Sequence, residues 1–156
     1  MARINSGVDP AFLSDQHLIA ESVEITMVTG GLRVNGYKIK GKVPDNYTLG
    51  KGHINFFKDK LVYLTQRLHE VNKQIAARGY SSGTHIDLDE YPAQFHNDWS
   101  PTWDATALVR ARIASRLMSP KSGRKGSEFH RYKGKVLGAA MDQFCADMLD
   151  SPLFYV

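Results

Sequence analysis

The feature that most constrains the fold of this chain is a stripe of apolar residues near its middle. Intervals of four, three, four, three and four residues separate the members of the stripe, which are Phe57, Leu61, Leu64, Leu68, Val71 and Ile75. This spacing places the side chains on one face of an α-helix, and that face must be buried against other elements. Gly79 directly follows Arg78 and is a natural C-terminal cap. The stripe therefore predicts a core helix that ends near residue 78.

An earlier helix is predicted over about residues 14–27. Ser14 is a good N-cap because its hydroxyl can accept a hydrogen bond from a backbone N–H in the first turn. We expect the glycine pair Gly30-Gly31 to break this helix. Residues 32–50 are rich in glycine, proline and asparagine, and we expect them to form a loop that can include a short hairpin.

Two more helices are predicted in the second half of the chain. One begins near Asp104 and ends by Met118, before a Ser-Pro pair. Long loops over 80–103 and 119–128 surround it, and a short final helix is expected over about 136–149. The residues of the 104–118 helix that we expect to face inward are Leu108, Ala111, Ala114 and Leu117.

These elements predict a mainly α fold in which long irregular segments connect three main helices and a short C-terminal helix. The 156 residues are enough for one domain with a sizeable core, so we expect a single compact domain over 1–156. No apolar stretch is long enough to span a membrane or to act as a signal region, which favours a soluble, cytoplasmic protein. The single cysteine, Cys145, excludes an internal disulfide and is expected to be a small buried residue on a helix.

Positive charge is concentrated in the first 135 residues. This part holds all 20 Lys and Arg but 13 of the 16 acidic residues, and the rest of the chain carries only Asp142, Asp147 and Asp150. A basic body with a mildly acidic tail suits a polyanionic partner such as a nucleic acid, although a solvated basic loop would have the same composition. The histidines and carboxylates show no metal-ligand spacing, so we expect no metal and no cofactor.

The first residues suggest a nucleophile. If Met1 is removed, the chain begins with the α-amine of Ala2, next to Arg3. An α-amine has a pKa of about 7.7–8.0, so a useful fraction is unprotonated near neutral pH. A carboxylate from the following helix would complete an amine-plus-acid pair of the kind that makes and breaks Schiff bases. Glu24 is the first candidate for this acid, although by its surroundings in the sequence it is an ordinary exposed helix carboxylate, and Glu21 is the second.

Motifs in the same order along residues 2–135 resemble the pyrimidine-dimer DNA glycosylase and abasic-site lyase family, the phage UV-repair enzymes of the endonuclease V type. Each motif is weak by itself, but their joint order is specific. Besides the N-terminal residues up to Glu24, the motifs are Leu49-Gly-Lys-Gly-His53, Pro92-Ala-Gln-Phe95, Ala111-Arg112-Ile113 with Arg116, and Phe129–Lys135. Residues 136–156 extend beyond most of the match.

The resemblance implies a mechanism and a partner. In it, the α-amine of Ala2 attacks the sugar C1′ of a damaged nucleotide, and Glu24 assists both imine formation and the later β-elimination, without a metal. The implied partner is double-stranded DNA that contains a lesion, bound by a monomer, and pyrimidine dimers are the favoured lesion. The residues that the resemblance implies at the DNA surface are Arg3, Gln16, His17, Arg112, Arg116, Phe129, Arg131, Tyr132, Lys133 and Lys135.

The chain also departs from the family. Val23 and Met27 stand where the best-known member has arginines that hold phosphates, and Ser22 replaces an aromatic residue. The 32–50 segment is shorter and the 119–128 loop is longer. The chemistry therefore looks retained, while the lesion could be a pyrimidine dimer, another damaged or modified base, or an abasic site. A non-catalytic DNA-binding protein of the same fold is the main alternative, and a metal-dependent nuclease is disfavoured.

Overall fold

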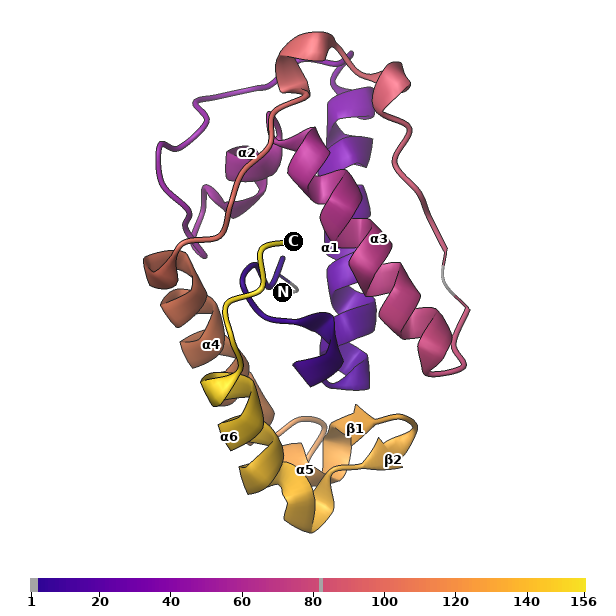
Figure 1. Ribbon diagram of the computed structural model, residues 1–156, viewed down its shortest axis with the longest axis vertical. Coiled ribbons are helices and arrows are strands. Elements are labelled where there is room, and N and C mark those ends of the chain that lie inside the picture. The colour runs from indigo at the N-terminus through magenta and orange to yellow at the C-terminus, as the bar shows by residue number, and fades with distance from the viewer. Residues whose placement is uncertain (1–2, 82) are drawn as a thin grey trace.

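The computed structural model describes residues 3–81 and 83–156 of the chain, and within these ranges the fold is mainly α, as predicted. Three long helices, α1 (Asp15–Val34), α3 (Leu61–Ala77) and α4 (Trp103–Met118), form its frame (Figure 1). The shorter elements are α2 (His53–Phe57), α5 (Gly126–Phe129), α6 (Met141–Asp150), the antiparallel strands β1 (Arg131–Tyr132) and β2 (Lys135–Val136), and the 3₁₀ turns η1 (Pro10–Phe12), η2 (Leu88–Glu90), η3 (Ala93–Phe95) and η4 (Gly138–Ala140).

Helix α1 begins as predicted but does not break where we expected. The Ser14 hydroxyl accepts a hydrogen bond from the His17 N–H at 3.2 Å. The helix then continues through Gly30 and Gly31 to Val34, so the predicted break is wrong. Each glycine costs roughly 1 kcal/mol relative to alanine in a helix. Fully buried Leu32, on the inner face of this turn, offsets that cost because burying such a side chain contributes about 1.5–3 kcal/mol.

The apolar stripe is buried along its whole length, but it belongs to two helices. Phe57 ends α2, and α3 begins at Leu61 after a short turn. The C-terminal cap is confirmed: Gly79 has a φ of +85°, and its N–H donates to the Ala76 carbonyl at 3.0 Å. The next N–H, of Tyr80, donates back into the last turn of α3. Left-handed backbone of this kind favours glycine and satisfies carbonyls that the helix leaves open.

Helix α4 also lies where predicted, but its buried face differs. Leu108 is 49% exposed and Ala111 is exposed, so their assignment to the inner face is wrong, while Ala114 is partly buried and Leu117 is fully buried. Apolar residues occur on almost every side of this helix, so the sequence could not fix its rotation. The inner face consists of Ala105, Val109, Ile113 and Leu117, at a spacing of four residues.

The C-terminal third contains an element that the sequence did not reveal. Strands β1 and β2 form a small hairpin whose two turn residues, Lys133 and Gly134, have φ of 51° and 83°. Positive φ at both positions is the mark of a tight hairpin turn. The hairpin that we allowed for within 32–50 is absent, since residues 35–52, all of them described, contain only turns and bends.

Helix α6 is shorter than predicted, because a 3₁₀ turn occupies residues 138–140. The tail packs on the core through a set of buried side chains that includes the free thiol of Cys145, as expected for a small buried residue on a helix. The other buried members are Leu137, Met141 and Met148.

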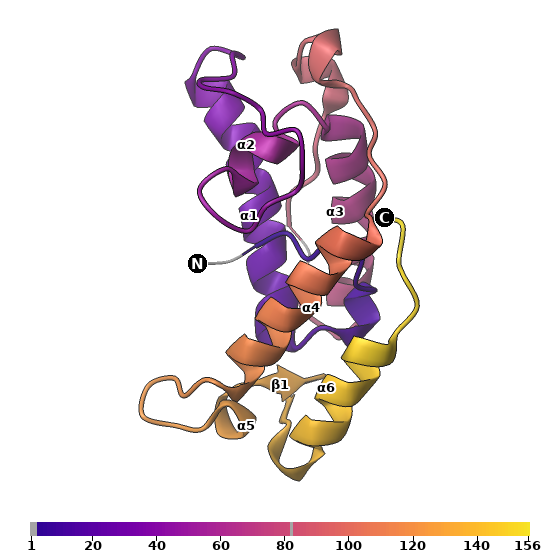
Figure 2. The same cartoon turned by 90° about the vertical axis from the view of Figure 1, so that its left-hand side faces the viewer.

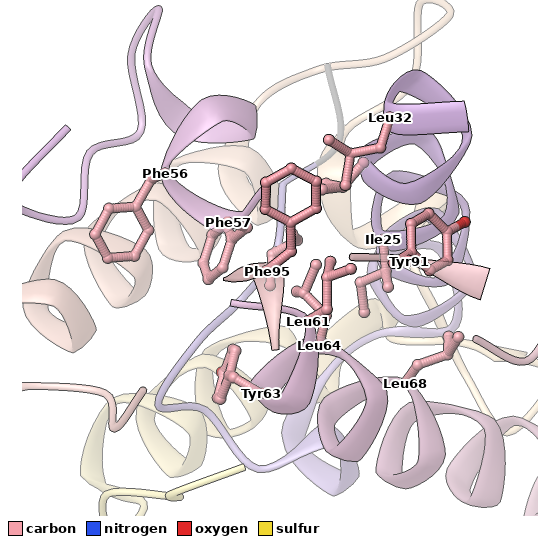
Figure 3. Packing of buried hydrophobic residues seen from close by; sticks show 12 residues of the cluster. Ile25, Leu32, Phe56, Phe57, Leu61, Tyr63, Leu64, Leu68, Tyr91 and Phe95 are labelled. Carbon is pink, nitrogen blue, oxygen red and sulfur yellow. The ribbon is translucent and has the colours of Figure 1, made fainter. Parts of the chain in front are cut away.

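Two apolar clusters form the core, and the N-terminal segment passes between them. Figure 3 shows the first cluster, in which Phe57, Leu64 and Ile25 join α2 and α3 to α1. The second cluster joins α4, α6 and the C-terminal half of α3. Ile4 packs in the first cluster and Val8 in the second, and both are fully inaccessible to solvent. None of the helices in the described ranges is long and apolar enough to cross a bilayer.

Candidate active site

His53 fixes the backbone of the N-terminal segment. The Ile4 N–H donates to His53 Nε2 at 3.0 Å, and His53 Nδ1 lies 2.8 Å from the Thr48 carbonyl oxygen. A carbonyl only accepts, so Nδ1 carries a proton, and Nε2 carries none because it accepts from the Ile4 N–H; the imidazole is therefore neutral. Burial favours this neutral form and lowers the pKa of His53 to about 4. The Tyr47 hydroxyl donates to the Ile4 carbonyl at 3.2 Å, so both backbone groups of residue 4 are held.

Glu21 holds the next residue from the opposite side. Its Oε1 accepts from the Asn5 N–H at 2.8 Å. Arg67 binds the same carboxylate through Nε at 2.8 Å and Nη2 at 3.0 Å, and neither side chain has any exposed surface. The remaining Nη1 of Arg67 donates to the Val8 carbonyl at 2.8 Å and the Val156 carbonyl at 2.7 Å. Glu21, the second candidate for the catalytic acid, is thus committed to an internal ion pair that anchors the N-terminal segment.

Glu24 lies one turn further along α1, in different surroundings. Its side chain is only 6% exposed, so the expectation of an ordinary exposed carboxylate is wrong. Its Oε1 is 3.8 Å from Nη1 of Arg3, whose Nε donates to the Leu49 carbonyl at 2.9 Å. Burial raises the pKa of Glu24, and the positive charges of Arg3 and Arg112 offset part of this effect. The arrangement places a buried carboxylate beside the third residue of the chain.

A pocket of about 600 Å³ lies next to Arg3, which forms part of its wall. Arg112 and Arg116 extend into the wall from α4, and Lys121 adds a fourth cation. Burial lowers the pKa of Arg112, and the neighbouring charges of Arg116 and Arg3 lower it further, as expected where cations crowd together. Such a site favours an anionic ligand. The predicted residues that line the pocket are Arg3, Gln16, His17, Arg112, Arg116 and Phe129.

Two neighbouring histidines, whose rings are tilted relative to each other, form another part of the wall. The ring centroids of His17 and His130 are 4.9 Å apart. Burial, followed by the neighbouring His130 and the α4 arginines, lowers the pKa of His17 to about 3, so its ring is neutral near pH 7. His130 is positioned by contacts of 3.3 Å to the Ser14 hydroxyl and to the Arg116 carbonyl. In the described part of the chain, His17 Nδ1 is buried without a hydrogen-bond partner, which leaves a polar atom at the wall of the pocket.

Gln16 shapes the pocket through both ends of its amide. Its Nε2 donates to the Phe129 carbonyl at 2.7 Å, and its Oε1 accepts from the Arg131 N–H at 2.9 Å. The Phe129 ring at the wall has two cations over it, with Lys121 Nζ and Arg124 Cζ each 5.5 Å from its centroid. These contacts join the 119–130 segment to the start of α1.

The other predicted residues of the aromatic and basic run lie in the hairpin, outside the wall of the pocket. Tyr132 is partly buried, its hydroxyl donates to the Ala11 carbonyl at 3.0 Å, and the Arg78 guanidinium lies 4.5 Å from its ring centroid. The hairpin turn is fixed by buried Asp15, whose carboxylate accepts from the Lys133 N–H at 3.0 Å and the Gly134 N–H at 2.8 Å. The exposed basic residues of the hairpin are Arg131, Lys133 and Lys135.

Sequence reasoning missed three polar residues that build the site, namely His53, Arg67 and Asp15. Arg67 left a signal, because it lies between Leu64 and Leu68 on the side of the helix that the apolar stripe buries. A charge at such a position predicts a buried ion pair. Ala2, the predicted nucleophile, lies outside the described residues. Within those residues there is no group of three or more His, Cys, Asp or Glu side chains that could hold a metal ion.

A protein-family model described as pyrimidine dimer DNA glycosylase matches residues 1–88. This is more than half of the 156-residue chain. The matched part includes α1, α2 and α3 together with Arg3 and Glu24, whereas α4, the 119–130 segment and the hairpin follow it. The chain therefore belongs to the pyrimidine dimer DNA glycosylase family.

Proposed function

We propose that this protein is a DNA repair glycosylase with coupled abasic-site lyase activity that acts at cyclobutane pyrimidine dimers. Family membership supports the glycosylase activity and the pyrimidine-dimer substrate. The lyase step, the nucleophile and the individual residue roles form our proposal. The observation that carries it is the buried Glu24 carboxylate, 3.8 Å from Arg3 on an N-terminal segment whose next residues are locked in place.

In the proposed reaction, the unprotonated α-amine of Ala2 attacks C1′ of the damaged nucleotide. The glycosidic bond breaks, and the base leaves with the bonding electron pair and takes up a proton. The nitrogen then loses one proton, its lone pair opens the C1′–O4′ bond, and O4′ takes up a proton, which leaves a positively charged imine between the chain and the sugar. The ionised Glu24 stabilises the positive charge that develops during these steps.

Strand cleavage follows from the same intermediate. The positive imine nitrogen acidifies the C2′ protons, and Glu24 removes one of them as a general base. The electron pair forms a C2′–C3′ double bond and expels the 3′ phosphate, and water then hydrolyses the imine. Ala2, which carries the amine, directly precedes Arg3 in the sequence, and consecutive α-carbons are only about 3.8 Å apart. The nucleophile is therefore one residue away from the arginine that contacts Glu24.

The cationic pocket supplies the grip on DNA in this proposal. Arg112 and Arg116 share one face of α4 and neutralise phosphates near the reacting sugar. Lys121 and Arg124, on the loop beyond α4, extend this positive surface and compensate for the apolar residues at Val23 and Met27. Replacing Lys121, Arg124 and Lys125 together by Gln should flatten the salt dependence of DNA binding, and an unchanged slope would contradict this role.

Borohydride trapping tests the proposal directly. The protein, with loss of Met1 confirmed by mass, is mixed with a duplex that carries one thymine dimer, or with an abasic-site duplex, in EDTA, and the imine is reduced. We expect a covalent complex with both duplexes and none after reductive methylation of the N-terminus. Trapping on the abasic duplex alone would support the second candidate, in which the same chemistry acts on another base. Trapping on neither would favour a non-catalytic DNA-binding protein.

The second candidate has a structural observation in its favour. Val23 and Met27 are 53% and 58% exposed on the helix that carries Glu24, where they offer no charge to a phosphate. The surface beside the catalytic carboxylate therefore differs in chemistry from one built of arginines. Parallel duplexes with different damaged bases would identify the lesion that gives the fastest trapping.

A further inference from the structure

Helix α1 exposes an apolar ridge, which we define as Ile19, Val23 and Met27. These side chains are 39%, 53% and 58% exposed, respectively. A spacing of four residues places them one above another on the same face of the helix. A surface helix normally carries polar or charged residues on its solvent side, so a ridge of this kind indicates a contact with something outside the described chain.

The same face of the helix carries no charge. Between His17 and Arg33 the only charged residues of α1 are Glu21 and Glu24, and both are buried. The chain has a net charge of +4, so an uncharged stretch of exposed helix contrasts with the rest of its surface. Gly30 lies one turn beyond Met27, and a β-carbon added there would meet no atom within 4 Å. No other described part of the chain therefore covers that end of the ridge.

The ridge is continuous with the proposed DNA site. Ile19 lines the cationic pocket together with Arg112 and Arg116 of α4. At its middle, Val23 directly precedes Glu24 in the sequence. Figure 1 shows α4 and α1 on either side of the N-terminal segment, and Figure 2 shows the same elements after a 90° turn. A ligand in the pocket that extends along α1 would therefore meet cations first and apolar side chains next.

We propose that this ridge packs against the faces of unstacked bases in the lesion duplex, while the α4 arginines hold the neighbouring phosphates. The inference rests on the proposed function, because it takes damaged DNA as the ligand. Apolar side chains gain nothing beside a phosphate, but proteins that kink DNA insert side chains such as Ile and Met between base steps. Unstacking costs a few kcal/mol and costs least at a damaged pair, so this contact selects for lesions.

Charge favours DNA over a second copy of the chain as the occupant. A two-fold contact through the ridge would bring two copies of the pocket, each with Arg3, Arg112 and Arg116, close to one another. Like charges at such a contact repel, whereas a DNA strand complements them. The ridge and the pocket therefore suit one polyanionic ligand that also offers apolar base faces.

The test compares a double variant, Val23→Ser with Met27→Gln, with the control Leu149→Gln, which changes an exposed leucine on α6 that is 40% accessible. Binding is measured on the Glu24→Gln background, so that no cleavage is needed and a failure of the proposed chemistry leaves the result intact. The ridge variant should bind the thymine-dimer duplex about tenfold more weakly with an unchanged salt slope, because no phosphate contact is lost. The affinity of the ridge variant for undamaged duplex should fall only about twofold, and the Leu149→Gln control should bind both duplexes as tightly as the parent.

A second variant guards against misfolding of the first. Val23→Arg with Met27→Arg should steepen the salt slope by about two phosphate contacts and reduce the preference for the lesion duplex. The proposal would be overturned if the Ser/Gln variant bound the lesion duplex within twofold of the parent's affinity and its thermal unfolding were unchanged. Self-association of the wild type that the ridge variant abolishes without a change in DNA affinity would also overturn it.

Discussion

Glu21 and Glu24 lie one turn apart on α1 and are both buried, yet their surroundings have little in common. The carboxylate of Glu21 binds Arg67 through both oxygens and also accepts from the Asn5 N–H. The carboxylate of Glu24 has one guanidinium, that of Arg3, at 3.8 Å, and this arginine lines the pocket. Among the described residues, Glu21 is thus held by a bidentate guanidinium and a backbone N–H, whereas the Arg3 guanidinium lies only at ion-pair distance from Glu24.

Under the proposed function, this difference gives the two carboxylates of one helix separate tasks. Burial against a complete set of partners makes Glu21 a structural anchor for the N-terminal segment. Burial raises the pKa of Glu24, and in the proposed reaction this carboxylate exchanges protons with the substrate. Four predictions test this division, from the largest expected effect to the smallest.

Glu24→Gln should abolish the chemistry without harming the fold. We expect the rate of strand cleavage to fall by about 10²–10⁴-fold, the usual contribution of a positioned acid or base. Because burial disfavours the ionised form of Glu24, the variant should be at least as stable as the wild type at pH 7. Single-turnover cleavage and urea unfolding measure the two effects. A loss of stability with normal cleavage would show that Glu24 is a structural residue and not the catalytic acid.

Breaking the Glu21–Arg67 pair should do the opposite. Arg67→Met leaves a carboxylate buried without its cation, and such a change costs about 3–5 kcal/mol of unfolding free energy. Changing both residues, to Glu21→Leu with Arg67→Met, should recover part of this loss because no unpaired charge remains. Denaturant unfolding of both single variants and the double variant measures the coupling, and additive losses would show that the two charges act independently.

His53 should affect both the fold and the reaction, since it holds Ile4 from the side opposite Glu21. His53→Phe leaves the Ile4 N–H buried without an acceptor, which should cost about 1–3 kcal/mol and slow imine trapping. His53→Gln carries an amide oxygen that can accept this N–H and should recover most of the trapping rate. Equal trapping by the two variants would show that the hydrogen bond does not position the segment.

The pH dependence of stability should report the neutral histidines. His53 and His17 have folded pKa values of about 4 and about 3, below the ordinary value of 6.5, so between these values the unfolded state binds protons that the folded state does not. Stability should therefore fall as the pH drops below 6.5, by about 1.4 kcal/mol per histidine for each of the first pH units. His53→Gln and His17→Gln should each flatten this slope, while Glu24→Gln should not remove it.

Much of the frame could be predicted from the sequence, because local signals agree with the tertiary contacts there. The stripe that ends at Ile75 and the caps at Ser14 and Gly79 are all confirmed. Gly30 and Gly31 misled the prediction, because the cost of two helical glycines is offset by burial of the apolar face of the same helix. The inner face of α4 was also missed, since apolar residues on all its sides leave the choice to packing partners far away in the sequence.

The site was predictable only in part, for a related reason. The family resemblance indicated Arg3, Arg112 and Arg116, and the structure places all three around one pocket. The burial of Glu24 depends on how α1 packs, which the sequence pattern of α1 does not reveal. The positioning role of His53 depends on a contact between residues 49 positions apart. Partners at such distances cannot be read from local patterns.

Arg67 donates hydrogen bonds both to Val8 in the N-terminal segment and to Val156, and this link has a consequence for the order of folding during synthesis. The early helices and His53 can hold residues 4 and 5 as soon as α3 has formed. The carbonyl of Gly7, however, receives its hydrogen bond from the N–H of Phe154, and Arg67 reaches the carbonyl of Val156. A chain emerging from the ribosome therefore holds its N-terminal segment incompletely until residue 156 has been made. We expect a nascent chain arrested before residue 150 to expose this segment to proteases that the finished protein resists.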